Sequence, residues 1–163
     1  MALPIRRLKA AARATLQLAE SVGDGKRGER WLHGVLLGYL EASVGDMESE
    51  YQVSRGHIDL RHGGNNPAVI EFVVRKHGVE NAPSMNRSEL AKLTRIPNTR
   101  ARTRYLLIID TSGYAPLKKD TTQQAYLRWH AGRGRFERQP VRVIYVHPDP
   151  RHDFDFSWDP YVS

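Results

Sequence analysis

The sequence contains no cysteine. Disulfide bonds and thiolate metal sites are therefore excluded, and a reducing compartment is compatible with the chain. No apolar run approaches the roughly 20 residues that a membrane-spanning helix needs. The first 20 residues have a basic start but no continuous apolar stretch and no clear cleavage site, so they do not read as a secretory signal. We therefore expect a cytoplasmic protein without a membrane partner.

Acidic residues are scarce relative to basic ones, with 18 Asp and Glu against 25 Lys and Arg and a net charge of +7. The basic residues gather before the first acid, within RIPNTRARTR and around the glycines of WHAGRGRFERQP. Arginine forks match phosphate oxygens, and such clusters indicate nucleic acid. A merely solvated basic surface is the alternative. The candidate nucleic-acid-binding residues are Arg6, Arg7, Lys9, Arg100, Arg102, Arg104, Arg133 and Arg135.

The 163 residues are enough for one domain with a real core. Apolar spacing and turn signals predict an α/β fold in which helices flank a mixed central β-sheet. The expected order is an amphipathic helix over 4–21, a helix from 29, strands at 49–54, 56–62 and 68–76, a helix at 88–93, a strand at 105–110, a helix at 121–132, a strand at 141–146 and an acidic tail over 148–163.

Two carboxylates lie inside apolar strands in the stretch RGHIDLRHGGNNPAVIEFVVRK, namely Asp59 and Glu71. If the two strands pair as a hairpin, the acids lie side by side, where they repel unless a cation lies between them. A hard divalent ion, Mg²⁺ or Mn²⁺, satisfies both and leaves positions for water and phosphate. In the alternative reading, Asp59 pairs with Arg61 or Arg55 and Glu71 faces solvent.

The order of these motifs resembles the PD-(D/E)XK, or restriction-endonuclease-like, nuclease superfamily. GKRGERWL resembles the start of its first helix, GHIDL and VIEFV resemble its acidic strands, and RSELAKL with RYLLIID resembles the helix and strand that follow. The resemblance covers roughly residues 26–112, with 121–147 as an extension. It implies an αβββαβ core with an extra N-terminal helix, a metal site of Glu29, Asp59 and Glu71, a Mg²⁺-dependent or Mn²⁺-dependent DNA endonuclease activity and, as in many relatives, a homodimer.

One position departs from the family pattern, because Val73 stands where the superfamily has its lysine. Arg75 shares the face of Glu71 by strand parity, but a guanidinium stays protonated and is a poor base. Lys76 points to the opposite face unless a bulge intervenes. Lys92, on the following helix, can reach back, as migrated lysines do in some relatives. The catalytic candidates are therefore Asp59, Glu71, Lys92 and Arg75, with Lys92 favoured over Arg75.

Three functions remain open at this stage. The first is the metal-dependent DNA endonuclease. The second is a catalytically inactive protein of the same fold that binds nucleic acid or a protein partner, with Val73 marking the lost site. The third is an interaction subunit that docks a partner through the N-terminal amphipathic helix. Gln123 and Gln124 read as an exposed helix face, and the histidines and aspartates of the tail read as a solvated loop rather than a metal cluster.

Overall fold

The computed structural model describes residues 2–22, 29–53, 56–75, 87–130 and 140–159. Four helices, six strands and one short 3₁₀ turn are present within these ranges. In chain order they are α1 (Ile5–Ser21), α2 (Glu29–Ser43), β1 (Met47–Val53), β2 (Gly56–His62), β3 (Ala68–Arg75), α4 (Arg87–Thr94), β4 (Thr103–Asp110), α5 (Lys119–His130), β5 (Val141–Val146), η1 (Pro150–His152) and β6 (Phe154–Trp158).

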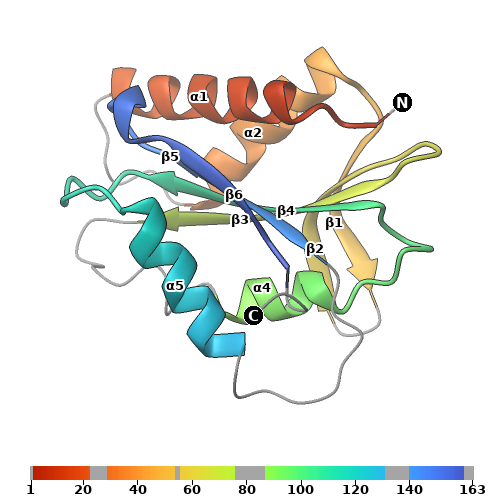
Figure 1. Ribbon diagram of the computed structural model, residues 1–163. Helices are drawn as coiled ribbons and strands as arrows, with labels where there is room; N and C mark the ends of the chain where they lie inside the picture. The colour runs from red at the N-terminus through yellow and green to blue at the C-terminus, as the bar shows by residue number, and fades with distance from the viewer. Residues whose placement is uncertain (1, 23–28, 54–55, 76–86, 131–139, 160–163) are drawn as a thin grey trace.

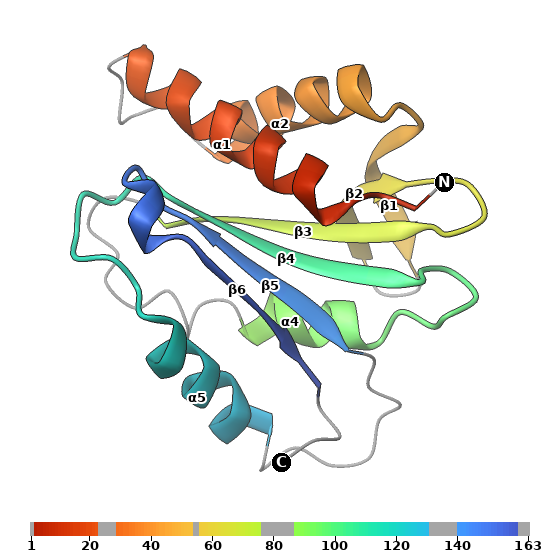
Figure 2. The same cartoon turned by 45° about the horizontal axis from the view of Figure 1, so that its top comes forward.

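The six strands form one mixed sheet in the order β1-β2-β3-β4-β5-β6, so sequence neighbours are also spatial neighbours (Figure 2). β1, β2 and β3 form an antiparallel meander, β3, β4 and β5 run parallel, and β6 returns antiparallel to β5. Parallel pairs need a crossover of a dozen or more residues, and α4 and α5 stand in the chain between the strands concerned. The predicted α/β class with a mixed sheet is confirmed.

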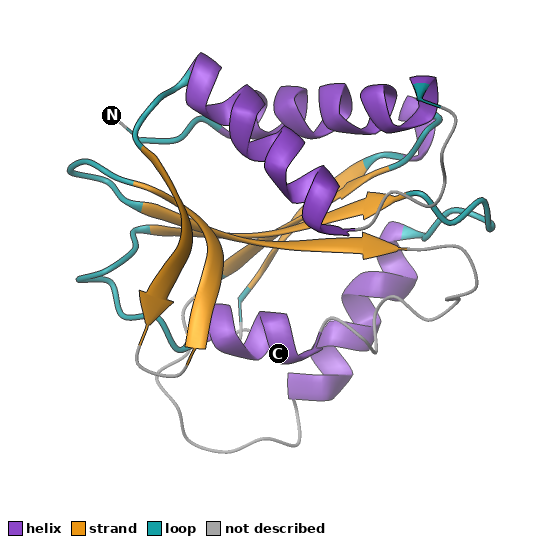
Figure 3. Cartoon of the chain, turned by 180° about the vertical axis from the view of Figure 1, so that it is seen from behind, coloured by secondary structure: helices purple, strands orange, loops and turns teal. Residues whose placement is uncertain are grey.

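Helices cover both faces of the sheet: α1 and α2 lie on one face, and α4 and α5 on the other (Figures 1 and 3). Each face has its own hydrophobic core. Leu8, Leu16 and Leu36 pack over the even positions of β3 on the first face, and Leu90, Leu93 and Tyr126 pack on the second. A strand between two helical layers is apolar throughout, which explains the run YLLIID in β4. None of the described helices is long and apolar enough to cross a membrane.

The apolar stripe of α1 is buried inside the protein, where Leu8, Ala12 and Leu16 are fully enclosed by α2 and the sheet. An interaction subunit that docked through this stripe would need it exposed. The third function suggested by the sequence therefore loses the surface on which it depended.

The turn between β2 and β3 fixes how the two acidic strands meet. Gly64 has φ +85°, a left-handed conformation that glycine adopts without strain. Pro67, just before β3, accepts a hydrogen bond from the backbone N–H of Arg102 at 2.7 Å. The turn is thereby tied to the basic loop that leads into β4.

The structure adds one strand that the sequence reading missed. The segment expected to be an acidic tail contains η1 and β6, and β6 pairs with β5 along its length. Phe156 and Trp158 point to the buried face, and Trp158 is 1% exposed. The strand FDFSW has the alternating apolar pattern of a half-buried strand, but the aspartates in and around it made the segment resemble a solvated tail.

Candidate functional site

Asp59 and Glu71 come together where β2 separates from β3. The ladder between these strands pairs His62 with Ala68 and ends at the pair Leu60–Ile70, one residue before Asp59 would face Glu71. Beyond that point, the Asp59 carboxylate takes the place of a strand carbonyl: its Oδ2 accepts a hydrogen bond from the backbone N–H of Phe72 at 2.8 Å. The side chain of Asp59 is thereby held against β3, beside Glu71.

The backbone around Asp59 is distorted. Ile58 packs into the core under α4, whereas Leu60, two residues later, packs under α1 and α2. A regular strand places such residues on the same face, so β2 changes face across Asp59. On the neighbouring strand, Glu50 has φ +51°, a sparsely populated conformation for a residue with a side chain. Strain of this kind gathers at functional sites.

Glu71 is the most strongly perturbed acid of this region. Its side chain lies in the middle of β3 and is 2% exposed. Burial and, next, the charge of Asp59 raise the pKa of Glu71 from 4.5 to about 8, against the opposing effect of Lys92. A carboxyl group with a pKa in this range changes protonation near neutral pH, and perturbed pKa values of this kind cluster at functional sites.

Lys92 reaches this acid from the last turn of α4. Its Nζ lies 2.6 Å from Oε1 of Glu71 and donates a hydrogen bond to the carbonyl oxygen of His57 at 2.9 Å. The contact with Glu71 is an ion pair without good hydrogen-bond alignment, because Oε1 accepts no well-aligned hydrogen bond in the described part of the chain. The predicted approach of Lys92 to Glu71 is therefore present, and a buried carboxylate oxygen remains incompletely satisfied.

These residues suit a hard divalent cation. Mg²⁺ and Mn²⁺ prefer carboxylate oxygens and keep several waters, so two carboxylates from the protein are sufficient. The incompletely satisfied Oε1 of Glu71, next to a second carboxylate, is a site where a cation lowers the electrostatic cost of burial. No group of three His, Asp or Glu side chains close enough to hold a metal occurs among the residues described. A cation here would take two protein carboxylates and complete its shell with water or backbone oxygens.

Glu29, the third predicted ligand, is not gathered into this pair. It begins α2 and is exposed. One helical turn later, His33 donates from Nε2 to the carbonyl oxygen of Asp59 at 3.1 Å and stacks on Phe72. Positions i and i+4 share a side of a helix, so Glu29 lies on the side of α2 that faces the Asp59 backbone. Sequence reasoning missed His33, and its spacing from Glu29 was the available signal.

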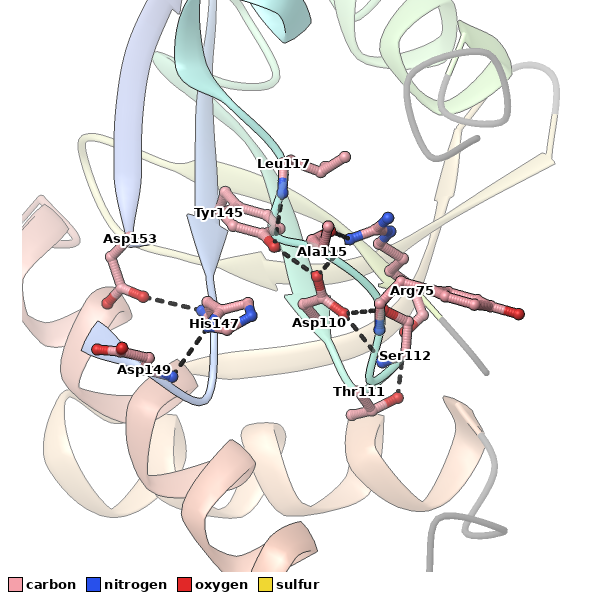
Figure 4. Close-up of polar contacts among 11 residues, drawn as sticks. Arg75, Asp110, Thr111, Ser112, Ala115, Leu117, Tyr145, His147, Asp149 and Asp153 are labelled. Atoms are coloured by element: carbon pink, nitrogen blue, oxygen red, sulfur yellow. Dashed lines mark hydrogen bonds and ion pairs between the residues drawn. The ribbon is translucent and has the colours of Figure 1, made fainter. Parts of the chain in front are cut away.

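Arg75, the other catalytic candidate, belongs to a separate buried network at the end of β3 (Figure 4). Its Nη1 donates to Oδ2 of Asp110 at 2.7 Å and to the carbonyl oxygen of Ala115 at 2.8 Å. Asp110 also accepts hydrogen bonds from the backbone and hydroxyl of Ser112 and from the hydroxyl of Tyr145. Burial raises the pKa of Asp110, but these hydrogen bonds outweigh it and hold the pKa below 3.8. Lys92 is therefore the cation that contacts Glu71.

The predicted nucleic-acid-binding residues fall into three groups. Arg6, Arg7, Arg100 and Arg102 are exposed. Lys9 is paired with Asp155, and Arg104 is 2% exposed and bound to the carbonyl oxygen of Ile96 and to Asn98. Arg133 and Arg135 lie outside the described residues. Arg100 donates a hydrogen bond to the hydroxyl of Tyr51. The guanidinium of Arg61 lies over the ring of the same tyrosine, 4.8 Å from the ring centroid.

The contacts of Asp59 and of the tail bear on the alternatives given for each: an ion pair with arginine for Asp59, and a solvated loop for the tail. Arg61 lies 4.0 Å from Glu48 and over Tyr51, whereas Asp59 is bound by the backbone of Phe72. Arg55, the other partner considered for Asp59, lies outside the described residues. In the tail, the backbone N–H of Asp149 donates to Nδ1 of His147, and Asp153 accepts from the backbone of His147 (Figure 4). These contacts shape the connection between β5 and β6. On α5, Gln124 is exposed and Gln123 half-buried.

Comparisons with protein-family models, with curated proteins and with solved structures each gave no match. The geometry of the site is therefore the basis for any functional proposal.

Proposed function

We propose that this protein is a metal-dependent nuclease that hydrolyses phosphodiester bonds in DNA, with a restriction-endonuclease-like core. The observation that carries the proposal is the pairing of Asp59 with the buried Glu71, whose pKa is raised to about 8, under the amine of Lys92. The order of one helix, three antiparallel strands, a helix and a parallel strand around the pair supports it.

Each residue has a separate task in this scheme. Asp59 and Glu71 would hold Mg²⁺ or Mn²⁺, and Glu29 would assist through water. A metal ion in such a site lowers the pKa of bound water and stabilises charge on the phosphate. Lys92, which already lies among these oxygens, would donate a hydrogen bond to the attacking water or to a phosphate oxygen. Attack by water forms a new P–O bond and breaks the P–O bond to the leaving deoxyribose oxygen; the attacking water loses one proton and the leaving oxygen gains one.

The exposed arginines extend this site toward a long anion. The basic loop before β4 is tied to the turn between the two acidic strands, and Arg100 reaches β1 through Tyr51. Arginines along a path from the site are suited to the phosphates that flank a scissile bond. This supports nucleic acid as the substrate class, with DNA as proposed.

The test is incubation of supercoiled and branched DNA with the purified protein in EDTA, Mg²⁺ and Mn²⁺. Metal-dependent cleavage is expected, absent in Asp59→Ala and in Glu71→Gln, and unchanged in Glu20→Gln, which alters an exposed acid on α1. Lys92→Ala is expected to lower the rate by about 10²- to 10⁴-fold, whereas Lys119→Ala on α5 serves as its exposed control. Full activity of Asp59→Ala with a normal circular dichroism spectrum would contradict the proposal.

A second function is favoured by one residue. Val73, in the position of the family lysine, is apolar and packs with the core under α4, which is the arrangement of a site that has lost its chemistry. A nucleic-acid-binding protein without catalysis would shift DNA in a gel in EDTA, with an affinity that falls steeply as salt rises. It would show no cleavage in either metal, and Asp59→Ala would not change its affinity.

A further inference from the structure

A cavity of about 410 Å³ opens at the end of the sheet where β4 and β5 begin. Tyr105, Arg142 and Ser157 lie at one level across β4, β5 and β6, because the strand register pairs Tyr105 with Arg142 and Arg142 with Ser157. All three contribute to the lining, together with Arg102, Arg104 and Ile5. The cavity is therefore built on rigid strands.

Arg104 gives this cavity a buried positive charge. Its side chain is 2% exposed, and Nε and Nη2 donate to the carbonyl oxygen of Ile96 and to Oδ1 of Asn98, both neutral acceptors. These hydrogen bonds come from Nε and Nη2, and among the described residues no carboxylate offsets the burial that lowers the pKa of Arg104 to about 10. Isolated buried charge is costly, and an anion in the cavity would offset that cost.

Two further features add positive potential to the same cavity. Arg102 is exposed at its rim. Ile5 begins α1, whose first turn contains no acidic residue and whose N-cap Pro4 makes no side-chain hydrogen bond. Helix N-termini attract anions. Arg142 is balanced by Asp155, which also binds Lys9, so the charge of Arg102 and Arg104 is not compensated by this acid.

We propose that this cavity binds a terminal phosphate group, carried by a nucleotide or by the end of a nucleic-acid strand. Arginine forks match phosphate oxygens in two-point hydrogen bonds. Pockets for small ligands have volumes of about 300–1,000 Å³, so the cavity has room for a nucleoside beside the phosphate, against the apolar surfaces of Tyr105 and Ile5. A terminal phosphate enters a concave site more easily than an internal diester of a duplex.

The experiment is isothermal titration calorimetry in EDTA with adenosine 5′-monophosphate, inorganic phosphate and adenosine. The nucleotide is expected to bind, and adenosine is not. Arg102→Ala, which leaves the buried core intact, is expected to weaken nucleotide binding by about tenfold, the loss of one charge-assisted contact. Arg104→Lys, which keeps the charge but loses the fork, is expected to weaken it as well. Arg151→Ala removes the same charge on η1, beyond the opposite end of β5, and is expected to have no effect.

The source of the phosphate is distinguished by oligonucleotides with a 5′-phosphate or a 5′-hydroxyl. Tighter binding of the phosphorylated strand than of the nucleotide identifies a strand end, and equal or weaker binding identifies a free nucleotide. Nucleotide binding weaker than about 1 mM, or equal losses in Arg102→Ala and Arg151→Ala, overturns the proposal. The proposal is independent of the nuclease function, because the titration contains no divalent metal and Asp59→Ala is expected to bind the nucleotide normally.

Discussion

Two buried carboxylates, Glu71 on β3 and Asp110 on β4, lie in similar surroundings and behave in opposite ways. Both are almost fully enclosed, at 2% and 1% exposure, on the side of the sheet that α4 and α5 cover. Burial alone raises the pKa of both. The pKa of Glu71 is nevertheless raised to about 8, whereas that of Asp110 is lowered.

The difference comes from what surrounds each carboxylate. Asp110 accepts hydrogen bonds from Ser112, Tyr145 and Arg75, so its charged form is stabilised. Glu71 contacts Lys92 but also faces a second acid, Asp59, and its Oε1 lacks a well-aligned donor. A fully satisfied acid holds a fold together, and an incompletely satisfied acid beside another is suited to a cation or a proton.

The largest effect is expected when the satisfied acid is neutralised. Asp110→Asn removes the charge that pairs with the buried guanidinium of Arg75, and breaking a buried ion pair in this way costs about 3–5 kcal/mol. The free energy of unfolding, measured by urea denaturation at neutral pH, is expected to fall by this amount.

The control for this change is Asp120→Asn, which alters an exposed aspartate in the first turn of α5. It is expected to change the free energy of unfolding by less than about 0.5 kcal/mol. A loss below about 1 kcal/mol in Asp110→Asn would remove the contrast between the two acids.

The second effect tests the perturbed acid through pH. The folded state holds the proton of Glu71 up to about pH 8, whereas the unfolded chain releases it near 4.5. The folded state therefore binds more protons between these values, and stability falls as pH rises through this range. The fall is at most about 1.4 kcal/mol per pH unit, and roughly 2–4 kcal/mol in total.

Glu71→Gln mimics the protonated form and removes this dependence. The free energy of unfolding of the variant minus that of the wild type is expected to grow more positive from pH 5 to pH 9, as measured by urea denaturation at each pH. A difference that stays constant with pH would mean that Glu71 titrates normally, so that the comparison with Asp110 fails.

Much of this arrangement could be predicted from the sequence, because local patterns carry it. Apolar periodicity located the four helices and five of the six strands, and strand parity placed the acids of HIDL and VIEFVV next to each other. The approach of Lys92 to Glu71 was implied by the resemblance to the nuclease superfamily, and the contact is present. The other predictions needed only residue order and the geometry of helices and strands.

The rest depended on contacts between distant segments. Arg75 has the strand parity that suggests a catalytic cation, but its neighbour in the parallel register is Asp110, 35 residues away. Arg104 looked like a surface arginine within RIPNTRARTR and is buried, because the carbonyl oxygen of Ile96 and Asn98 receive its guanidinium. β6 was hidden by the aspartates in and beside it; the one inside the strand, Asp155, binds Lys9 across 146 residues.

The third prediction concerns the proposed cation, which should bind at Glu71 and not at Asp110. Mg²⁺ or Mn²⁺ is expected to stabilise the folded protein by about 1–3 kcal/mol near saturation, because a ligand that binds only the folded state adds RT ln(1 + [L]/Kd). The gain should be larger at pH 9 than at pH 6, since Glu71 must lose its proton to bind a metal. Differential scanning calorimetry with and without the metal measures it.

Glu71→Gln and Asp59→Asn are the variants in which this gain should vanish, whereas Asp110→Asn should keep it despite its lower stability. An equal metal-dependent gain in Glu71→Gln would place the cation elsewhere.

The smallest effect concerns a third carboxylate, which has partners but is partly open to solvent. Asp155 lies 2.6 Å from the amine of Lys9 and also pairs with Arg142. Burial raises the pKa of Asp155, but the hydrogen bonds from Lys9 and Arg142 outweigh it and lower the pKa. The Lys9 and Asp155 side chains are 42% and 20% exposed, so water screens the pair, and exposed ion pairs contribute about 0–1 kcal/mol.

Lys9→Met keeps the aliphatic part of the side chain and removes the charge. We expect the free energy of unfolding, measured by urea denaturation, to fall by less than about 1 kcal/mol, because Arg142 still pairs with Asp155. A loss as large as that of Asp110→Asn would show that the burial of an ion pair does not decide how much it contributes to the free energy of unfolding. A small loss would leave the donors around each carboxylate, together with its burial, as the property that distinguishes Asp110, Asp155 and Glu71.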